Sequence, residues 1–229
     1  MSGQHAAGGS AYRAVLFDLG GVILTSPLEF IRNYERGRGL PEGLVARLLG
    51  GYGTESESPW HALERGELLF DDFCPAFDEL AQGLGHDLDT RSLMLGMSQN
   101  SCIQPLMVAA LRELRAKGYL VAALTNIWAT PGGMSDRYTE LGPEFDEFIE
   151  SYRVGLRKPE TAIFELAFET VGVPAGETVF LDDIGANLKV GRQLGLTTIK
   201  VTSPTQCLTE LQAVLGMELA CLTAHGDEA

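Results

Sequence analysis

Short apolar runs alternate with longer segments of helical period along most of the chain. A short apolar run bounded by polar or turn residues is typical of a buried parallel strand. We expect such strands at residues 14–17, 119–124, 148–149, 178–181 and 197–201. Helices with one apolar face are expected between them, at residues 105–117, 186–194 and 205–215. A further helix is expected to open at Lys158-Pro159, with Glu160 in its first turn. This alternation predicts an α/β fold with a doubly wound parallel sheet.

The segment between the first and second predicted strands has a helical pattern and no long apolar run. One helix is expected at residues 27–36, and another begins where Ser58 serves as the cap and Pro59 enters the first turn. Asp71 or Asp72 is expected to cap a third helix. Its apolar face has helical spacing and comprises Phe73, Phe77, Leu80 and Leu84.

These patterns divide the chain into three parts. Residues 11–24 and 98–229 form the predicted α/β core domain, and residues 25–97 are inserted into it as a helical subdomain. Residues 1–10 are small, polar and glycine-rich, which predicts a disordered leader rather than a signal peptide or membrane anchor. No apolar run in the sequence approaches the length of a transmembrane helix.

The charge of the chain excludes some classes of binding partner. With 31 acidic and 17 basic residues among 229, the formal net charge is −14, so we expect neither nucleic acid nor membrane as a partner. An anionic substrate would need a local cation to offset this charge. The four cysteines lack metal-ligand spacing and are expected to be buried, reduced thiols of a cytoplasmic protein. They are Cys74, Cys102, Cys207 and Cys221.

Polar groups stand where three of the predicted strands end: Asp18, Thr125-Asn126 and Asp182-Asp183. Lys158 lies at the start of a predicted helix between the second and third of them. The polar residues at the strand ends could also be ordinary turn or cap residues, since aspartate, threonine and asparagine are common in turns and helix caps. In a parallel sheet, however, strand ends of one polarity meet along one edge, where ligands bind. Gly20 and Gly21 after Asp18 allow a sharp turn and a close approach to a ligand.

The chemistry that these groups share is phosphoryl transfer. A carboxylate is a competent nucleophile toward phosphorus, and clustered carboxylates repel one another unless a cation lies among them. Hard oxygen ligands favour Mg²⁺, which also binds phosphate. Lys158 is expected to hold phosphoryl oxygens, to which the Thr125 hydroxyl and the Asn126 backbone N–H also donate.

Four short motifs in order resemble the haloacid dehalogenase-like (HAD) hydrolase superfamily. They are Phe17-Asp18-Leu19-Gly20-Gly21-Val22, Leu124-Thr125-Asn126, Arg157-Lys158-Pro159 and Phe180-Leu181-Asp182-Asp183-Ile184-Gly185-Ala186-Asn187. The last of these, together with Phe145-Asp146 and Val154-Gly155, is similar to the N-terminal phosphatase-like domain of soluble epoxide hydrolase and its relatives, and residues 61–68 resemble the helical cap of that group. The resemblance covers residues 12–215 and implies a Rossmann-like core with residues 25–97 as the cap. No epoxide chemistry is implied.

The resemblance also implies roles for individual residues. Asp18 would be the nucleophile and a metal ligand, Lys158 the phosphoryl clamp, and Thr125 and Asn126 substrate-binding residues. The metal site for Mg²⁺ would further comprise the Gly20 carbonyl, Asp183 as a direct ligand, and Asp182 as a ligand directly or through water. Asn187 is expected to be a hydrogen-bond donor near the metal rather than a ligand. The implied function is a Mg²⁺-dependent phosphatase that acts on a small phosphorylated metabolite through an aspartyl-phosphate intermediate.

The chain departs from this family at Gly20, where phosphatases of the superfamily usually carry an acid/base aspartate. General acid–base catalysis of this kind contributes typically ~10²–10⁴-fold. Two alternatives therefore remain. A dehalogenase also lacks this aspartate, but its displacement at carbon needs no metal, which leaves the Asp182-Asp183 pair unexplained. The second is a catalytically impaired HAD fold that serves in binding or regulation.

Overall fold

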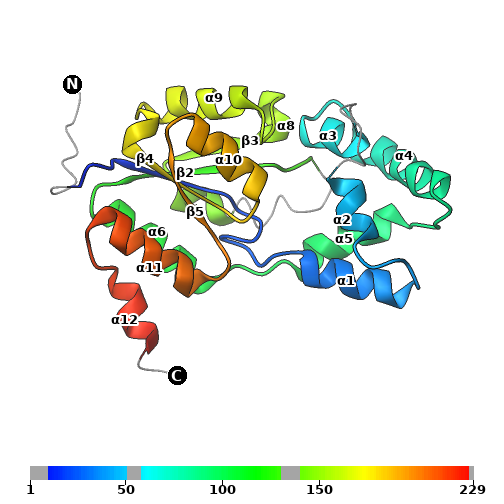
Figure 1. Ribbon diagram of the computed structural model, residues 1–229, viewed down its shortest axis with the longest axis horizontal. Coiled ribbons are helices and arrows are strands. Elements are labelled where there is room, and N and C mark those ends of the chain that lie inside the picture. Colours follow the sequence, from blue (N-terminus) through cyan, green and yellow to red (C-terminus); the bar gives the residue numbers. More distant parts are fainter. Residues whose placement is uncertain (1–9, 51–57, 130–139, 227–229) are drawn as a thin grey trace.

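The computed structural model describes residues 10–50, 58–129 and 140–226, so the predicted leader lies outside the described residues apart from Ser10. Figure 1 shows an α/β lobe and a helical lobe side by side, with both termini on the α/β lobe. The helical lobe comprises α1 (Leu28–Gly37), α2 (Leu44–Leu49), α3 (Pro59–Glu64), α4 (Phe70–Gly83) and α5 (Thr90–Asn100). No helix among the described residues is long and apolar enough to cross a membrane.

A five-stranded, all-parallel sheet with the order β3-β2-β1-β4-β5 forms the centre of the α/β lobe. Its strands are β1 (Ala14–Phe17), β2 (Leu120–Thr125), β3 (Glu147–Glu150), β4 (Thr178–Asp182) and β5 (Thr197–Lys200). The accompanying α-helices are α6 (Pro105–Ala116), α8 (Ser151–Val154), α9 (Thr161–Val171), α10 (Gly185–Gln193), α11 (Pro204–Leu215) and α12 (Ala220–Gly226). Two 3₁₀ turns, η1 (Gly142–Glu144) and η2 (Ala175–Glu177), precede β3 and β4. The doubly wound α/β fold is thus confirmed.

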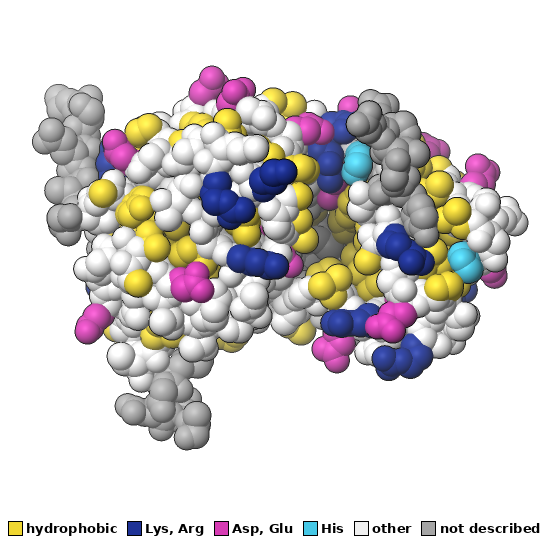
Figure 2. All heavy atoms as spheres, in the orientation of Figure 1, with side chains coloured by type: hydrophobic (Ala, Val, Ile, Leu, Met, Phe, Trp, Pro, Cys, Tyr) yellow, Lys and Arg dark blue, Asp and Glu magenta, His cyan; other side chains and the backbone are white. Residues whose placement is uncertain are grey.

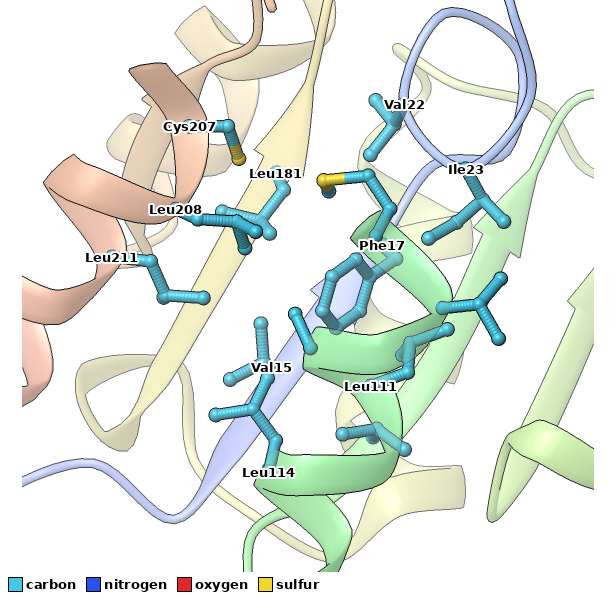
Figure 3. Close-up of a cluster of buried hydrophobic side chains, with 14 of the residues drawn as sticks. Val15, Phe17, Val22, Ile23, Leu111, Leu114, Leu181, Cys207, Leu208 and Leu211 are labelled. Atoms are coloured by element: carbon cyan, nitrogen blue, oxygen red, sulfur yellow. The ribbon is translucent and has the colours of Figure 1, made fainter. Parts of the chain in front are cut away.

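Apolar clusters cover both faces of this sheet. On one face, Val15 and Phe17 of β1 pack with Leu111 of α6 and Leu208 of α11 (Figure 3). On the other face, Leu16 of β1 belongs to a cluster that includes buried residues of α9 and α10. Because neighbouring residues of β1 face opposite clusters, the whole strand is buried, as its unbroken apolar sequence indicated.

The helical lobe has an apolar core of its own. Phe73 and Phe77 of α4, both fully buried, lie in this core with residues of α1, α2 and α5. Trp128, which follows β2 in the α/β lobe, belongs to the same cluster and is 8% exposed. Its ring lies 5.2 Å from the ring of Trp60 on α3, measured between centroids. A side chain of the α/β lobe therefore completes the core of the helical lobe.

Several local predictions were wrong. Helix α9 begins at Thr161 with Glu160 as its N-cap, so Lys158 and Pro159 precede the helix rather than open it. The N-cap of α4 is Leu69, while Asp71 and Asp72 lie in its first turn. In contrast, Ser58 caps α3 as expected, because its side chain accepts from the Trp60 N–H.

The cysteine expectation is only partly confirmed. All four thiols are free. Cys74 and Cys207 are buried, but Cys102 is exposed and Cys221 is half-buried. Cys102 lies between α5 and α6, where its backbone N–H donates to the Thr25 hydroxyl at 3.0 Å. The expectation failed there because this linker runs along the surface, where an apolar side chain gains no burial.

Candidate active site

The register of the sheet places Asp18 beside Asp182. Phe17 pairs with Leu181 across β1 and β4, so the next residues, Asp18 and Asp182, lie side by side. The Asp18 N–H donates to the Leu181 carbonyl at 2.9 Å. Side chains alternate along a strand, so both carboxylates lie on the face of the sheet that Leu16 and Phe180 occupy. Asp18 is 8% exposed and Asp182 is fully buried.

Lys158 approaches these carboxylates from the segment before α9. Its Nζ lies 3.0 Å from Asp18 Oδ1 and 2.7 Å from Asp182 Oδ2, and it stands 5.4 Å from the centre of the Phe180 ring. The side chain is 1% exposed. Burial lowers the pKa of Lys158, but the two carboxylates outweigh this effect and hold the pKa above its usual value. The residue is therefore an ammonium cation at neutral pH.

Asp183 completes an acidic cluster with Asp18 and Asp182. Each of these three side chains offers a carboxylate oxygen, and the three oxygens lie within 4.8 Å of one another. Burial raises the pKa of Asp18 to about 7 even though Lys158 opposes it, and burial together with Asp182 raises the pKa of Asp183 to about 6. Three carboxylates and one ammonium leave a formal charge of −2. This set of hard oxygen donors fits a divalent cation such as Mg²⁺.

Hydrogen bonds already occupy both oxygens of Asp182. Oδ1 accepts from the Ile184 N–H at 2.6 Å, and Oδ2 accepts from Lys158. The Asn187 amide donates to both oxygens, at 3.2 and 3.0 Å, in keeping with the role expected for it. The bond to Ile184 is the turn chemistry that an aspartate before a helix often provides. A hydrogen bond from its own backbone acts on the Asp183 carboxylate, but no side chain of another described residue donates to it.

The Asp18 carboxylate is held by one oxygen only. Oδ1 accepts from the Leu19 N–H at 2.7 Å and pairs with Lys158, and no donor among the described residues reaches Oδ2. Gly21, at φ 77°, lies directly beside Asp183, where an added Cβ would overlap the Asp183 carboxylate. The turn after β1 thus needs glycine at position 21, because only a backbone without a side chain leaves room for Asp183.

Thr125 and Asn126 follow at the end of the neighbouring strand, β2. Thr125 is 2% exposed, and its hydroxyl makes no hydrogen bond with the described residues. The Asn126 side chain instead holds the backbone of Lys158 on both sides: its Oδ1 accepts from the Lys158 N–H at 2.8 Å, and its Nδ2 donates to the Lys158 carbonyl at 2.9 Å. The residues predicted from three strand ends and Lys158 therefore come together at one edge of the sheet.

A buried ion pair behind Lys158 was not predicted. Arg157 Nε donates to Glu64 Oε2 on α3 at 2.6 Å, so a side chain of the helical lobe contacts the residue before the lysine. Both residues lie in segments singled out in the sequence, but they are 93 positions apart, and no local pattern links them. The surface is hollowed between the two lobes, and charged and hydrophobic side chains lie at the edges of this hollow (Figure 2).

Comparisons with known proteins agree with this geometry. The family model of haloacid dehalogenase-like hydrolases matches residues 12–195. Acyl-CoA dehydrogenase family member 10 of Mus musculus is 34% identical over 93% of this chain and 20% of its own length. Bifunctional epoxide hydrolase 2 of the same species is 34% identical over 91% of this chain and 40% of its own length. The chain thus spans well under half the length of these two relatives.

Two further matches extend over nearly the whole of the other protein. Sesquiterpene phosphatase astK of Aspergillus oryzae is 27% identical over 90% of this chain and 98% of its own. A HAD family enzyme of Bacteroides thetaiotaomicron, solved with magnesium and inorganic phosphate, has a TM-score of 0.60 at 20% identity and covers 84% of this chain and 96% of its own. The protein belongs to the haloacid dehalogenase-like hydrolases.

Proposed function

We propose that this hydrolase is a Mg²⁺-dependent phosphatase that acts on a small phosphorylated metabolite through an aspartyl-phosphate on Asp18. The observation that carries the proposal is the state of the Asp18 carboxylate. One oxygen is fixed by Leu19 and Lys158, and the other is free to attack. The names of the similar proteins, a phosphatase and an enzyme with bound magnesium and phosphate, support the same chemistry.

In the first step, Asp18 Oδ2 attacks phosphorus, and the bond from phosphorus to the ester oxygen breaks, leaving the electron pair on that oxygen. In the second step, water attacks the aspartyl-phosphate, the bond from phosphorus to Asp18 breaks, and phosphate leaves with the carboxylate restored. The proton that this water loses balances the negative charge on the departed oxygen. Lys158 and the Thr125 hydroxyl donate to the phosphoryl oxygens in both steps.

Asp18, Asp183 and the Gly20 carbonyl would hold the Mg²⁺, with Asp182 as a ligand directly or through water. The ion would stabilise charge on the phosphoryl oxygens as a Lewis acid. Residues 25–97 are proposed to serve as the cap that excludes water from the site and sets the choice of substrate.

The test is phosphate release from para-nitrophenyl phosphate and acetyl phosphate, with Mg²⁺ or with a chelator. We expect Asp18→Asn to reduce kcat by roughly 10³-fold or more, because the amide keeps the shape of the carboxylate but cannot attack phosphorus. Asp71→Asn is the matched control, since this aspartate is exposed on α4 and pairs with the exposed Arg91. The control should match the wild type.

Two results would contradict the proposal. Near wild-type turnover by Asp18→Asn would remove Asp18 as the nucleophile. Chloride release from a 2-haloacid without metal, in the absence of phosphatase activity, would identify a dehalogenase instead, which the lack of a carboxylate at Gly20 also fits.

A further inference from the structure

Glu64 is a buried carboxylate of the helical lobe that points into the α/β lobe. It is the last residue of α3, and α3 lies against α8 (Figure 1). Its side chain is 6% exposed, and the Arg157 guanidinium that donates to it is 13% exposed. Burying two opposite charges rarely adds stability relative to apolar residues of similar size, because both must be desolvated. A pair of this kind is better explained by the position that it enforces.

The Glu64–Arg157 pair lies next to Lys158 and can fix the position of this lysine. Arg157 is its neighbour in the chain, and the Asn126 amide holds the Lys158 backbone directly. Burial raises the pKa of Glu64, while the Arg157 guanidinium, which donates to it, acts in the opposite direction. Glu64 therefore fixes the side chain of the residue that directly precedes Lys158.

A close backbone contact with α8 fixes the position of α3. Gly66, two residues after Glu64, has φ 72°, and a Cβ there would lie 2.6 Å from the Tyr152 carbonyl of α8. The turn after α3 thus packs directly on the segment that leads to Arg157. Because this contact leaves little space between the two backbones, Glu64 has a defined distance to Arg157.

We propose that Glu64 is a positioning residue of the helical lobe, which holds Arg157 so that the Lys158 ammonium stays between Asp18 and Asp182. The inference rests on the proposed function, because Lys158 is assigned there to the phosphoryl oxygens. It links the packing of the helical lobe to the reactivity of the site: Lys158 is correctly positioned only when α3 packs against α8 and Glu64 holds Arg157.

The test compares Glu64→Gln and Glu64→Ala with Glu67→Gln. Glu67 is the matched control, since it lies on the same turn, is 50% exposed and pairs with Arg65 rather than with Arg157. We expect both Glu64 variants to lower kcat on para-nitrophenyl phosphate by about 10- to 100-fold, with Glu64→Gln less affected, because a small displacement of a group that stabilises the transition state is costly. KM should change little, and Glu67→Gln should match the wild type.

Two measurements separate positioning from a general loss of folding. The Lys158 amide, which donates to Asn126, should exchange its hydrogen several-fold faster in the Glu64 variants by NMR, while amides of the β1 strand keep their protection. In a cycle with Arg157→Gln, the double variant should lose no more activity than the worse single variant, because the two residues act as a unit.

The outcomes are distinguishable from failure of the proposed function. If the wild type releases no phosphate from any ester, the proposed function fails, and the exchange of the Lys158 amide still decides whether Glu64 positions it. If the wild type is an active phosphatase but Glu64→Ala folds with wild-type kcat and wild-type exchange at Lys158, the inference about Glu64 is wrong. Equal losses in Glu67→Gln and Glu64→Gln would also overturn it.

Discussion

At the scale of single residues, Gly20 and Gly21 differ in whether the structure requires glycine at their positions. Gly21 has a positive φ and lies against Asp183, so a side chain there would overlap the Asp183 carboxylate. Gly20 has neither constraint: its φ is outside the left-handed range, and an added Cβ would meet no described atom within 4 Å. The missing carboxylate at position 20 is therefore a chemical feature of this chain rather than a requirement of the turn.

This difference yields a prediction for Gly20→Asp. In the proposed mechanism, no acid at position 20 protonates the leaving oxygen, so esters whose oxygen is already a weak base, such as aryl and acyl phosphates, should be preferred. Because the backbone and the free space accept a side chain, the new carboxylate should raise kcat/KM for alkyl phosphates by up to about 10²-fold while aryl esters gain less. The measurement is the ratio of kcat/KM for aryl and alkyl esters in both proteins.

Gly20→Asn is the control for this variant, since it adds a side chain of the same size that carries no acid. An equal gain in the asparagine variant would rule out proton transfer as the cause. A wild type that already hydrolyses alkyl and aryl phosphates equally well would mean that another residue supplies the proton.

Some residues of the site could be predicted from the sequence, and others could not. Asp18 follows β1, and Thr125 and Asp182 are the last residues of β2 and β4. Parallel strands bring such positions together at one edge of the sheet. Glu64 and Arg157 were not accessible in this way, because their contact depends on how the helical lobe packs on the α/β lobe. Neither residue has a periodicity that encodes this packing.

At the scale of elements, buried strands were easier to predict than helix starts. All five strands lie within a residue or so of the predicted ranges, although the edge strands β3 and β5 are only partly buried. The start of α9 was misplaced because proline usually favours the first turn of a helix, whereas here Lys158 and Pro159 lie in a turn before α9, from which Lys158 contacts Asp18 and Asp182. The site therefore overrides the local preference of the sequence.

The contact between the two lobes leads to a prediction for Trp128. This side chain belongs to the α/β lobe but packs in the core of the helical lobe, against Trp60. Trp128→Ala should reduce the free energy of unfolding by about 3–5 kcal/mol, because it leaves a large cavity in that core. Urea denaturation followed by far-UV circular dichroism provides the measurement.

Trp128→Phe serves as the matched variant, since a phenyl ring refills most of the cavity and should recover most of the loss. A loss below about 1 kcal/mol in the alanine variant would show that the cluster closes without Trp128. The alanine variant should also lower the cooperativity of unfolding, because the two cores would no longer share a side chain.

At the scale of the whole molecule, the strongly negative charge of the chain adds to the cost of the acidic cluster. The formal net charge is −14, and the cluster of Asp18, Asp182, Asp183 and Lys158 contributes −2 of it in a buried setting. A buried negative charge is costly, as the raised pKa values of Asp18 and Asp183 reflect. The protein without metal should therefore become less stable as these two groups ionise.

This cost leads to a prediction about pH and Mg²⁺. The folded-state pKa is about 7 for Asp18 and about 6 for Asp183, against 3.8 for an unperturbed aspartate. Between pH 4 and 7 the folded state binds more protons than the unfolded state, so these groups reduce the stability of the metal-free protein as the pH rises. Mg²⁺ removes this penalty by competing with the protons. It should raise Tm more at pH 7.5 than at pH 5.

The expected size follows from mass action. At a Mg²⁺ concentration 100 times Kd, the gain is about 2.7 kcal/mol, or about 5–10 °C in Tm for a chain of this length. Differential scanning calorimetry at matched ionic strength measures it at both pH values. Asp183→Asn should raise the Tm of the metal-free protein at pH 7.5 and abolish the response to Mg²⁺, because it relieves repulsion and removes a ligand. Asp71→Asn should keep the response, since its carboxylate is exposed and remote from the cluster. A Mg²⁺ shift of equal size at pH 5 and pH 7.5, or one that survives in Asp183→Asn, would mean that the ion binds the acidic surface rather than this site.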